Sequence, residues 1–169
     1  MAGLVRRRAE QRAAMRRAGE LGKRTEYLAF SLAGDTYAVE IRLIAEILRP
    51  PPITEVPRAP RSVIGVVSVR GKLVTLLDLR KRFKVKESPI SRLSRILLVD
   101  RGHEDLIGLL VDEVHQVYRL ADSEIEPANV LGGEQPPHIF GIGRPSGVGT
   151  GGSASALLIL LDLRPILES

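Results

Sequence analysis

The residue types that most often carry chemistry are sparse in this chain of 169 residues, and their spacing does not fit a catalytic site. His103, His115 and His138 lie far apart, and no two of them have the helical spacing of a metal-ligand pair. The chain has no cysteine, which excludes disulfides, thiolate nucleophiles and thiolate metal sites. The acidic pairs at 104–105 and 112–113 fall in turn-like or strand-end stretches, where carboxylates are usually solvated. We therefore expect no catalytic centre, no metal and no cofactor.

One glycine-rich stretch, "GVGTGG" at 147–152, formally matches the dinucleotide-binding pattern G-x-G-x-x-G. That pattern binds a pyrophosphate only where it follows a strand and opens a helix. Here it lies in a Gly/Ser run at 143–156 and precedes an apolar stretch. We interpret residues 143–156 as a flexible loop and the chain as a protein that is not an enzyme.

The charge is concentrated at the N-terminus. Residues 1–24 hold eight Lys/Arg and two Glu, a net charge of +6, whereas the remaining residues hold 17 basic and 18 acidic side chains, a net charge of −1. We predict that 1–24 is a solvated, helical or disordered extension; a contact with anionic lipid, nucleic acid or an acidic partner is the alternative. No apolar run is long enough for a membrane span or a signal peptide, so we expect a soluble, cytoplasmic protein.

The elements that would position a site are short apolar runs separated by Gly, Pro and Asp. We predict strands at 27–32 and 37–41 around a Gly34-Asp35 turn. The segment "RPPPITEVPRAP" at 49–60 has five prolines and cannot form a regular element. The run "SVIGVVSVRGKLVTLLDL" predicts a hairpin that turns at Arg70-Gly71; because both strand faces are apolar, we expect it to be central to a core.

The pentapeptide "LLDLR" occurs at 76–80 and again, 84 positions later, at 160–164. Each copy predicts a strand end, an aspartate N-cap and the start of a helix. Apolar positions from Val39 to Ile47 recur at a constant offset of 70, so the second unit needs about fourteen extra residues, which the Gly/Ser loop can supply. We predict an internal duplication that forms two small β-barrel-like lobes.

Small barrels often bind single-stranded nucleic acid, and this function is the alternative to a protein-binding role. Nucleic-acid surfaces combine basic residues with stacking aromatics. This chain has three Tyr, three Phe and no Trp, so only the basic tail could supply the electrostatic attraction.

The segments "EYLAFSLAGDTYAVEIRLIAEIL", "VPRAPRSVIGVVSVRGKLVTLLDLR", "LIGLLVDEVHQV" and "LLILLDLRPIL" resemble the CheW family of chemotaxis coupling proteins. The resemblance covers residues 25–168. It implies an all-β fold with short helices: two intertwined, five-stranded SH3-like lobes around a shared core, one at about 37–94 and one at about 95–160, with the terminal segments crossing between them. It also implies a cytoplasmic scaffold that links the regulatory domain of a CheA-type histidine kinase to the cytoplasmic tip of methyl-accepting receptors.

The resemblance also implies two surfaces. Glu46 and Arg70 match an ion pair near the kinase-binding face, and Ile47 and Gly65 flank that face. A purely structural salt bridge is the alternative for the pair. The receptor-binding groove is expected at Ile44, Leu73 and Ile96. Burial in the core is the alternative for the aliphatic positions.

Overall fold

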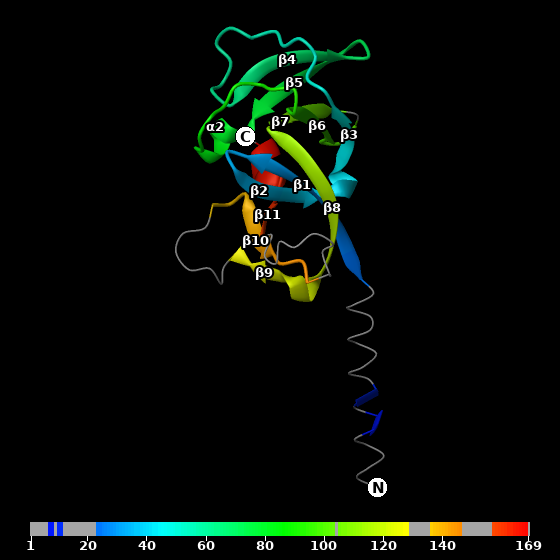
Figure 1. The fold of residues 1–169 in the computed structure, drawn as a ribbon. Helices are drawn as coiled ribbons and strands as arrows, with labels where there is room; N and C mark the ends of the chain where they lie inside the picture. The colour runs from blue at the N-terminus through cyan, green and yellow to red at the C-terminus, as the bar shows by residue number, and fades with distance from the viewer. Residues whose placement is uncertain are drawn as a thin grey trace.

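A computed structural model describes residues 7–8, 10–11, 23–103, 105–128, 136–146 and 157–168. The described part of the chain is mostly β and folds into two sheets (Figure 1), which confirms the predicted all-β class with short helices. A six-stranded sheet has the order β8-β1-β2-β11-β10-β9 and a five-stranded sheet the order β3-β6-β7-β5-β4. The strands are β1 (Arg24–Leu32), β2 (Asp35–Glu40), β3 (Ile44–Leu48), β4 (Val63–Val69), β5 (Lys72–Asp78), β6 (Arg95–Asp100), β7 (Leu106–Val111), β8 (Glu113–Ala121), β9 (Ile125–Pro127), β10 (Ile139–Gly143) and β11 (Leu158–Leu161).

Short helical segments join some of these strands, and one follows the last strand. They are the 3-10 turns η1 (Ile41–Leu43) and η2 (Asp122–Glu124) and the helices α2 (Leu79–Phe83) and α3 (Arg164–Leu167). Residues 7–8 and 10–11 are also helical, while the rest of 1–22 lies outside the described residues. The same is true of 147–156, which include the glycine-rich pattern. No helix within the described ranges is long and apolar enough to cross a membrane.

The two sheets exchange segments of the chain. The first two strands belong to the six-stranded sheet, the next five form the other sheet, and the chain then returns at β8 to complete the first. In Figure 1 the five-stranded sheet lies above the six-stranded one, and α3 lies between them. The lobe limits near 37–94 and 95–160 remain a prediction. The sheets do not follow these limits, because β6 and β7 belong to the same sheet as β3 to β5, and β2 belongs to the same sheet as β11.

The strand pairing supports the internal duplication in detail. The first pentapeptide ends β5, which pairs in parallel with β7 and places Leu76 opposite Gly108. The second ends β11, which pairs in parallel with β2 and places Leu160 opposite Ala38. The two leucines are 84 positions apart and their partners 70, which are the two offsets seen in the sequence. The repeated letters therefore mark equivalent places in two copies of one structural unit.

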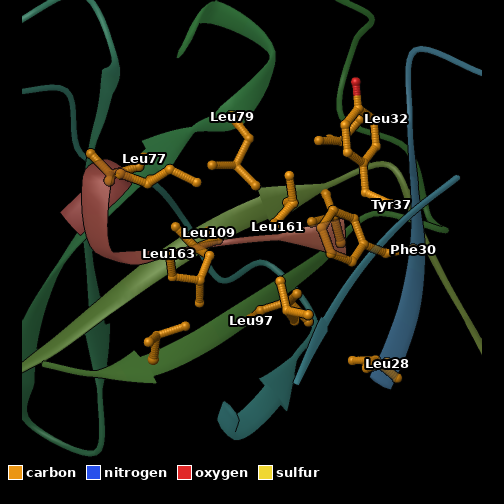
Figure 2. Close-up of a cluster of buried hydrophobic side chains, with 14 of the residues drawn as sticks. Leu28, Phe30, Leu32, Tyr37, Leu77, Leu79, Leu97, Leu109, Leu161 and Leu163 are labelled. Atoms are coloured by element: carbon orange, nitrogen blue, oxygen red, sulfur yellow. The ribbon is translucent and has the colours of Figure 1, made fainter. Parts of the chain in front are cut away.

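Apolar side chains fill the space between the sheets and the interior of each sheet. The shared core takes Phe30 and Tyr37 from the six-stranded sheet and Leu97 and Leu109 from the five-stranded one (Figure 2). A second cluster packs among strands of the five-stranded sheet, and a third packs among strands of the six-stranded sheet. Because the shared core draws on both copies, neither sheet buries its inner surface without the other.

Of three local predictions, two need correction. The first turn lies at Ala33-Gly34, one residue earlier than expected, because β2 already begins at Asp35. The hairpin does turn at Arg70-Gly71, where both residues have positive φ, 49° and 81°. The prediction that this hairpin is central to the core holds for β5, which lies inside the sheet and contributes to two buried clusters. It fails for β4, which is an edge strand, and for Leu73, which is 76% exposed. Both faces of β5 meet buried clusters, Val74 and Leu76 on one face and Leu77 on the other, and exposure is confined to the end of the strand near the turn.

Candidate functional site

An ion pair closes the open side of the five-stranded sheet. Glu46 lies on the edge strand β3, and Arg70 lies in the turn between β4 and β5. The guanidinium donates to both carboxylate oxygens, Nη1 to Oε1 at 3.0 Å and Nη2 to Oε2 at 2.5 Å. The hydrogen bond from Arg70 lowers the pKa of Glu46, and the same bond raises the pKa of Arg70. Both groups are therefore charged near neutral pH, and they fix the hairpin tip against β3.

Two exposed aliphatic side chains lie close to this ion pair in the sequence. Ile47 follows Glu46 on β3 and is 42% exposed, while Leu73 lies three residues beyond Arg70 in the same hairpin. The ion pair is itself solvent-accessible, with exposed side-chain fractions of 70% for Arg70 and 34% for Glu46. We call this set, Glu46, Ile47, Arg70 and Leu73, the hairpin face. It combines apolar area with a preorganised charge pair, which is the composition expected of a protein-binding surface.

Gly65 lies in β4, one of the two strands of the hairpin that carries Arg70 and Leu73. It is buried in β4 at a register shift opposite β5. A Cβ on this residue would lie 2.2 Å from the carbonyl oxygen of Thr54, which pairs with Val66 through two backbone hydrogen bonds. Only glycine lets the proline-rich segment approach β4 so closely. The role of Gly65 is thus to shape the backbone, and its surface is not available to a partner.

The three predicted groove residues do not share one surface. Ile44 is half-buried, packs on the shared core and stands opposite Val99. Leu73 belongs to the hairpin face. Ile96 has 0% of its surface exposed and packs inside the five-stranded sheet, so the expectation that it lines an open groove needs correction. Its alternation along β6 directs the side chain inward.

A cavity of about 880 Å³ lies at the junction of the two sheets. Its apolar lining comes from η1, β6, β10, β11, α3 and the residue before α3: Leu43, Val99, Phe140, Leu161, Leu163 and Leu167. We call it the junction groove. The sequence did not reveal it, because its walls come from segments of both copies that meet only in the folded chain.

In both pentapeptides the arginine folds back on the aspartate two residues earlier and closes a hydrogen-bonded ring, but the surroundings of the two rings differ. In the first, Asp78 accepts from the Arg80 amide at 2.9 Å, from Nε at 3.0 Å and from Nη2 at 3.2 Å. In the second, Asp162 accepts from the same three atoms of Arg164 at 3.0, 3.0 and 2.8 Å. The Arg80 side chain is 6% exposed, whereas that of Arg164 is 83% exposed and borders the junction groove.

The histidines do not converge on a site. His115 hydrogen-bonds to Ser31, and His138 stacks on Phe83 with ring centroids 4.1 Å apart. Burial lowers the pKa of His138, and the positive charge of Arg82 lowers it further. Within the described ranges, no group of three or more His, Asp or Glu side chains could hold a metal ion.

Comparison with known proteins agrees with this architecture. The CheW-like domain model matches residues 26–169. The chemotaxis protein CheW of Helicobacter pylori is 29% identical over 70% of this chain and 72% of its own, and that of Klebsiella aerogenes is 26% identical over 85% and 82%. The crystal structure of the scaffolding protein TtCheW from Thermoanaerobacter tengcongensis superimposes with a TM-score of 0.73 at 27% identity, covering 87% of this chain and 94% of that one. The resemblance seen in the sequence is thereby confirmed, and the chain belongs to the CheW family of chemotaxis scaffold proteins.

Proposed function

We propose that this chain is a non-enzymatic adaptor that couples methyl-accepting chemoreceptors to a CheA-type histidine kinase. Membership of a family of chemotaxis scaffolds supports a role in assembly. The observation that carries the proposal is the hairpin face, where a solvent-exposed bidentate ion pair lies within three residues of the exposed side chains of Ile47 and Leu73.

The hairpin face is our candidate for the surface that binds the regulatory domain of the kinase. Exposed ion pairs contribute little to stability, so the Glu46–Arg70 pair is poorly explained as a stabilising device. Its two hydrogen bonds instead hold a guanidinium and a carboxylate in fixed positions, which reduces the entropy lost when a partner binds. Burying Ile47 and Leu73 would provide the apolar centre of the interface.

The junction groove is our candidate for the surface that binds the receptor tip. A groove with an aliphatic floor accepts the apolar face of an amphipathic helix. Ile44 does not itself line this groove, but it pairs on β3 with Val99, which does, and this neighbour supports the assignment of Ile44 to the receptor site. Leu73 neither lines the groove nor pairs with a residue that does, so we assign Leu73 to the kinase face. Two separate surfaces would let one molecule hold both partners at once.

Titration of the purified chain against the kinase regulatory domain tests the kinase face. Because the pair is exposed, Glu46→Arg and Arg70→Glu should each leave the fold intact and weaken binding at least tenfold through charge reversal. The double variant restores the intramolecular pair with reversed orientation. It should refold normally yet still bind poorly, since the partner then meets each charge in the wrong place.

The exposed Arg144–Glu126 pair in the other sheet, at 3.2 Å, gives a matched control. Its reversal should leave kinase affinity within twofold of the unaltered chain. Equal losses for the two pairs would mean that the hairpin face has no special role.

A further inference from the structure

The internal duplication shows which contacts one arginine of the junction groove lacks. In the first copy, the outer nitrogen of Arg80, Nη1, donates to the Ser88 carbonyl, to the Ser88 hydroxyl at 3.1 Å and to a carboxylate oxygen of Asp112 at 3.4 Å. In the second copy, the Arg164 side chain forms the same ring with its aspartate, but no described residue accepts from its Nη1. The Nη1 edge of the Arg164 guanidinium is thus exposed to solvent, whereas the same edge of Arg80 donates to Ser88 and Asp112.

The residue equivalent to Asp112 has the opposite charge. Gly108 stands opposite Leu76 and Ala38 opposite Leu160, and four positions beyond these two residues lie Asp112 and Arg42. Arg42 lines the junction groove together with Arg164. An arginine–aspartate pair in the first copy is therefore replaced in the second by two arginines, with exposed side-chain fractions of 74% and 83%.

We propose that Arg42 and Arg164 form a subsite for one carboxylate of the segment that docks in the junction groove. An aspartate or glutamate of the partner would take the place that Asp112 has in the first copy. The guanidinium of Arg164 would donate to it through Nη1 and keep Asp162 on its other edge. Such charge-assisted hydrogen bonds are stronger than neutral ones, and an arginine has donors for both partners. This inference rests on the proposed receptor-binding role of the groove and names the chemistry that would be recognised there.

The acidic groups of the groove restrict the partner to a single acid at this point. Arg42 pairs with Glu40 and Arg101 with Asp105, and the groove is also lined by Asp100 and Glu168. A polyacidic segment would be repelled by these carboxylates. The fitting occupant is a helix with one acidic residue opposite Arg164, apolar residues toward the floor and a basic residue one turn away, near Asp100 or Glu168.

The test is a titration with the cytoplasmic-tip hairpin of a receptor from the same organism. We expect Arg164→Ala to weaken binding about five- to tenfold and to reduce its dependence on salt. Arg42→Asp recreates the internal pair of the first copy, so it should weaken binding at least as much. The exposed residue Arg61, outside the groove, provides the control: Arg61→Ala should change affinity less than twofold.

Neutralising the acids of the hairpin one at a time, by Glu→Gln or Asp→Asn, locates the partner group. One such change should weaken binding to the unaltered chain and have little further effect on Arg164→Ala. The inference alone would be overturned if the unaltered chain binds the hairpin and Arg164→Ala and Arg42→Asp change the affinity no more than the control Arg61→Ala does. Absence of binding by the unaltered chain would overturn the receptor-binding role as well.

Discussion

The two copies of one pentapeptide provide a matched pair of arginines for a stability experiment. Arg80 and Arg164 make the same hydrogen bonds to the aspartate two residues earlier, yet one is buried and the other is in solvent. Substitution by alanine at each position therefore removes the same local ring from two different environments. The difference between the two free energies of unfolding measures the effect of burial.

The expected costs follow from the surroundings. Burial alone would lower the pKa of Arg80, but the hydrogen bond and the attraction of Asp78 raise it, so the guanidinium is charged. Arg80→Ala leaves the carboxylate of Asp78, which is 2% exposed, without its cation. Removing one member of a buried ion pair costs about 3–5 kcal/mol. Arg164→Ala removes a solvent-exposed partner, which costs about 0–0.5 kcal/mol.

Urea unfolding followed by circular dichroism measures both values. Asp78→Asn in the Arg80→Ala background gives a further check, because an uncharged amide still caps α2 and does not need a counter-charge. The double variant should therefore recover at least 1 kcal/mol relative to Arg80→Ala alone. Equal costs for Arg80→Ala and Arg164→Ala, or no recovery in the double variant, would refute the argument that burial makes the first ion pair essential.

Three further predictions follow from other parts of the fold. Gly65→Ala should destabilise by about 2–3 kcal/mol, since the new methyl group must push away the Thr54 carbonyl and break two backbone hydrogen bonds; Ser68→Ala, on the exposed face of the same strand, should cost under about 0.5 kcal/mol in the same urea assay. Burial would raise the pKa of Glu124. Hydrogen bonds from the Ser146 and Ala121 amides and from the Ser146 hydroxyl, together with the positive charge of Arg24, outweigh burial and lower this pKa from 4.5 to about 2. Its stabilisation, about 3 kcal/mol, is thus present above pH 4.5 and lost as the pH falls toward 2, and urea midpoints of Glu124→Gln should show a smaller acid loss than the unaltered chain. Leu73→Ser should leave stability within about 0.5 kcal/mol but weaken kinase binding in a titration, whereas equal affinity would remove Leu73 from the hairpin face.

Much of the fold could be predicted because its signals are local. The Arg70-Gly71 turn, the aspartate caps and the repeated pentapeptide each depend on a few neighbouring residues. The ion-pair partners Glu46 and Arg70 came from the family resemblance, and their bidentate contact agrees with that pairing.

The errors arose where exposure depends on distant segments. Ile96 and Leu73 are both aliphatic residues in apolar strands, but Ile96 is fully buried and Leu73 is mostly exposed to solvent. A pattern of alternating residues does not say which strands cover a given face. The junction groove and the contrast between Arg80 and Arg164 were hidden for the same reason, since each depends on how the two copies pack together.

The most direct test of the adaptor role is co-sedimentation of the kinase with receptor-containing membranes, with and without this chain. The account predicts that the unaltered chain brings the kinase into the pellet. Glu46→Arg should leave the chain on the receptors but release the kinase, while Ile44→Asp should leave kinase binding in solution and lose the receptors. Failure of the unaltered chain to recruit the kinase, or loss of both partners together in each folded variant, would contradict the claim that two separate surfaces couple receptor to kinase.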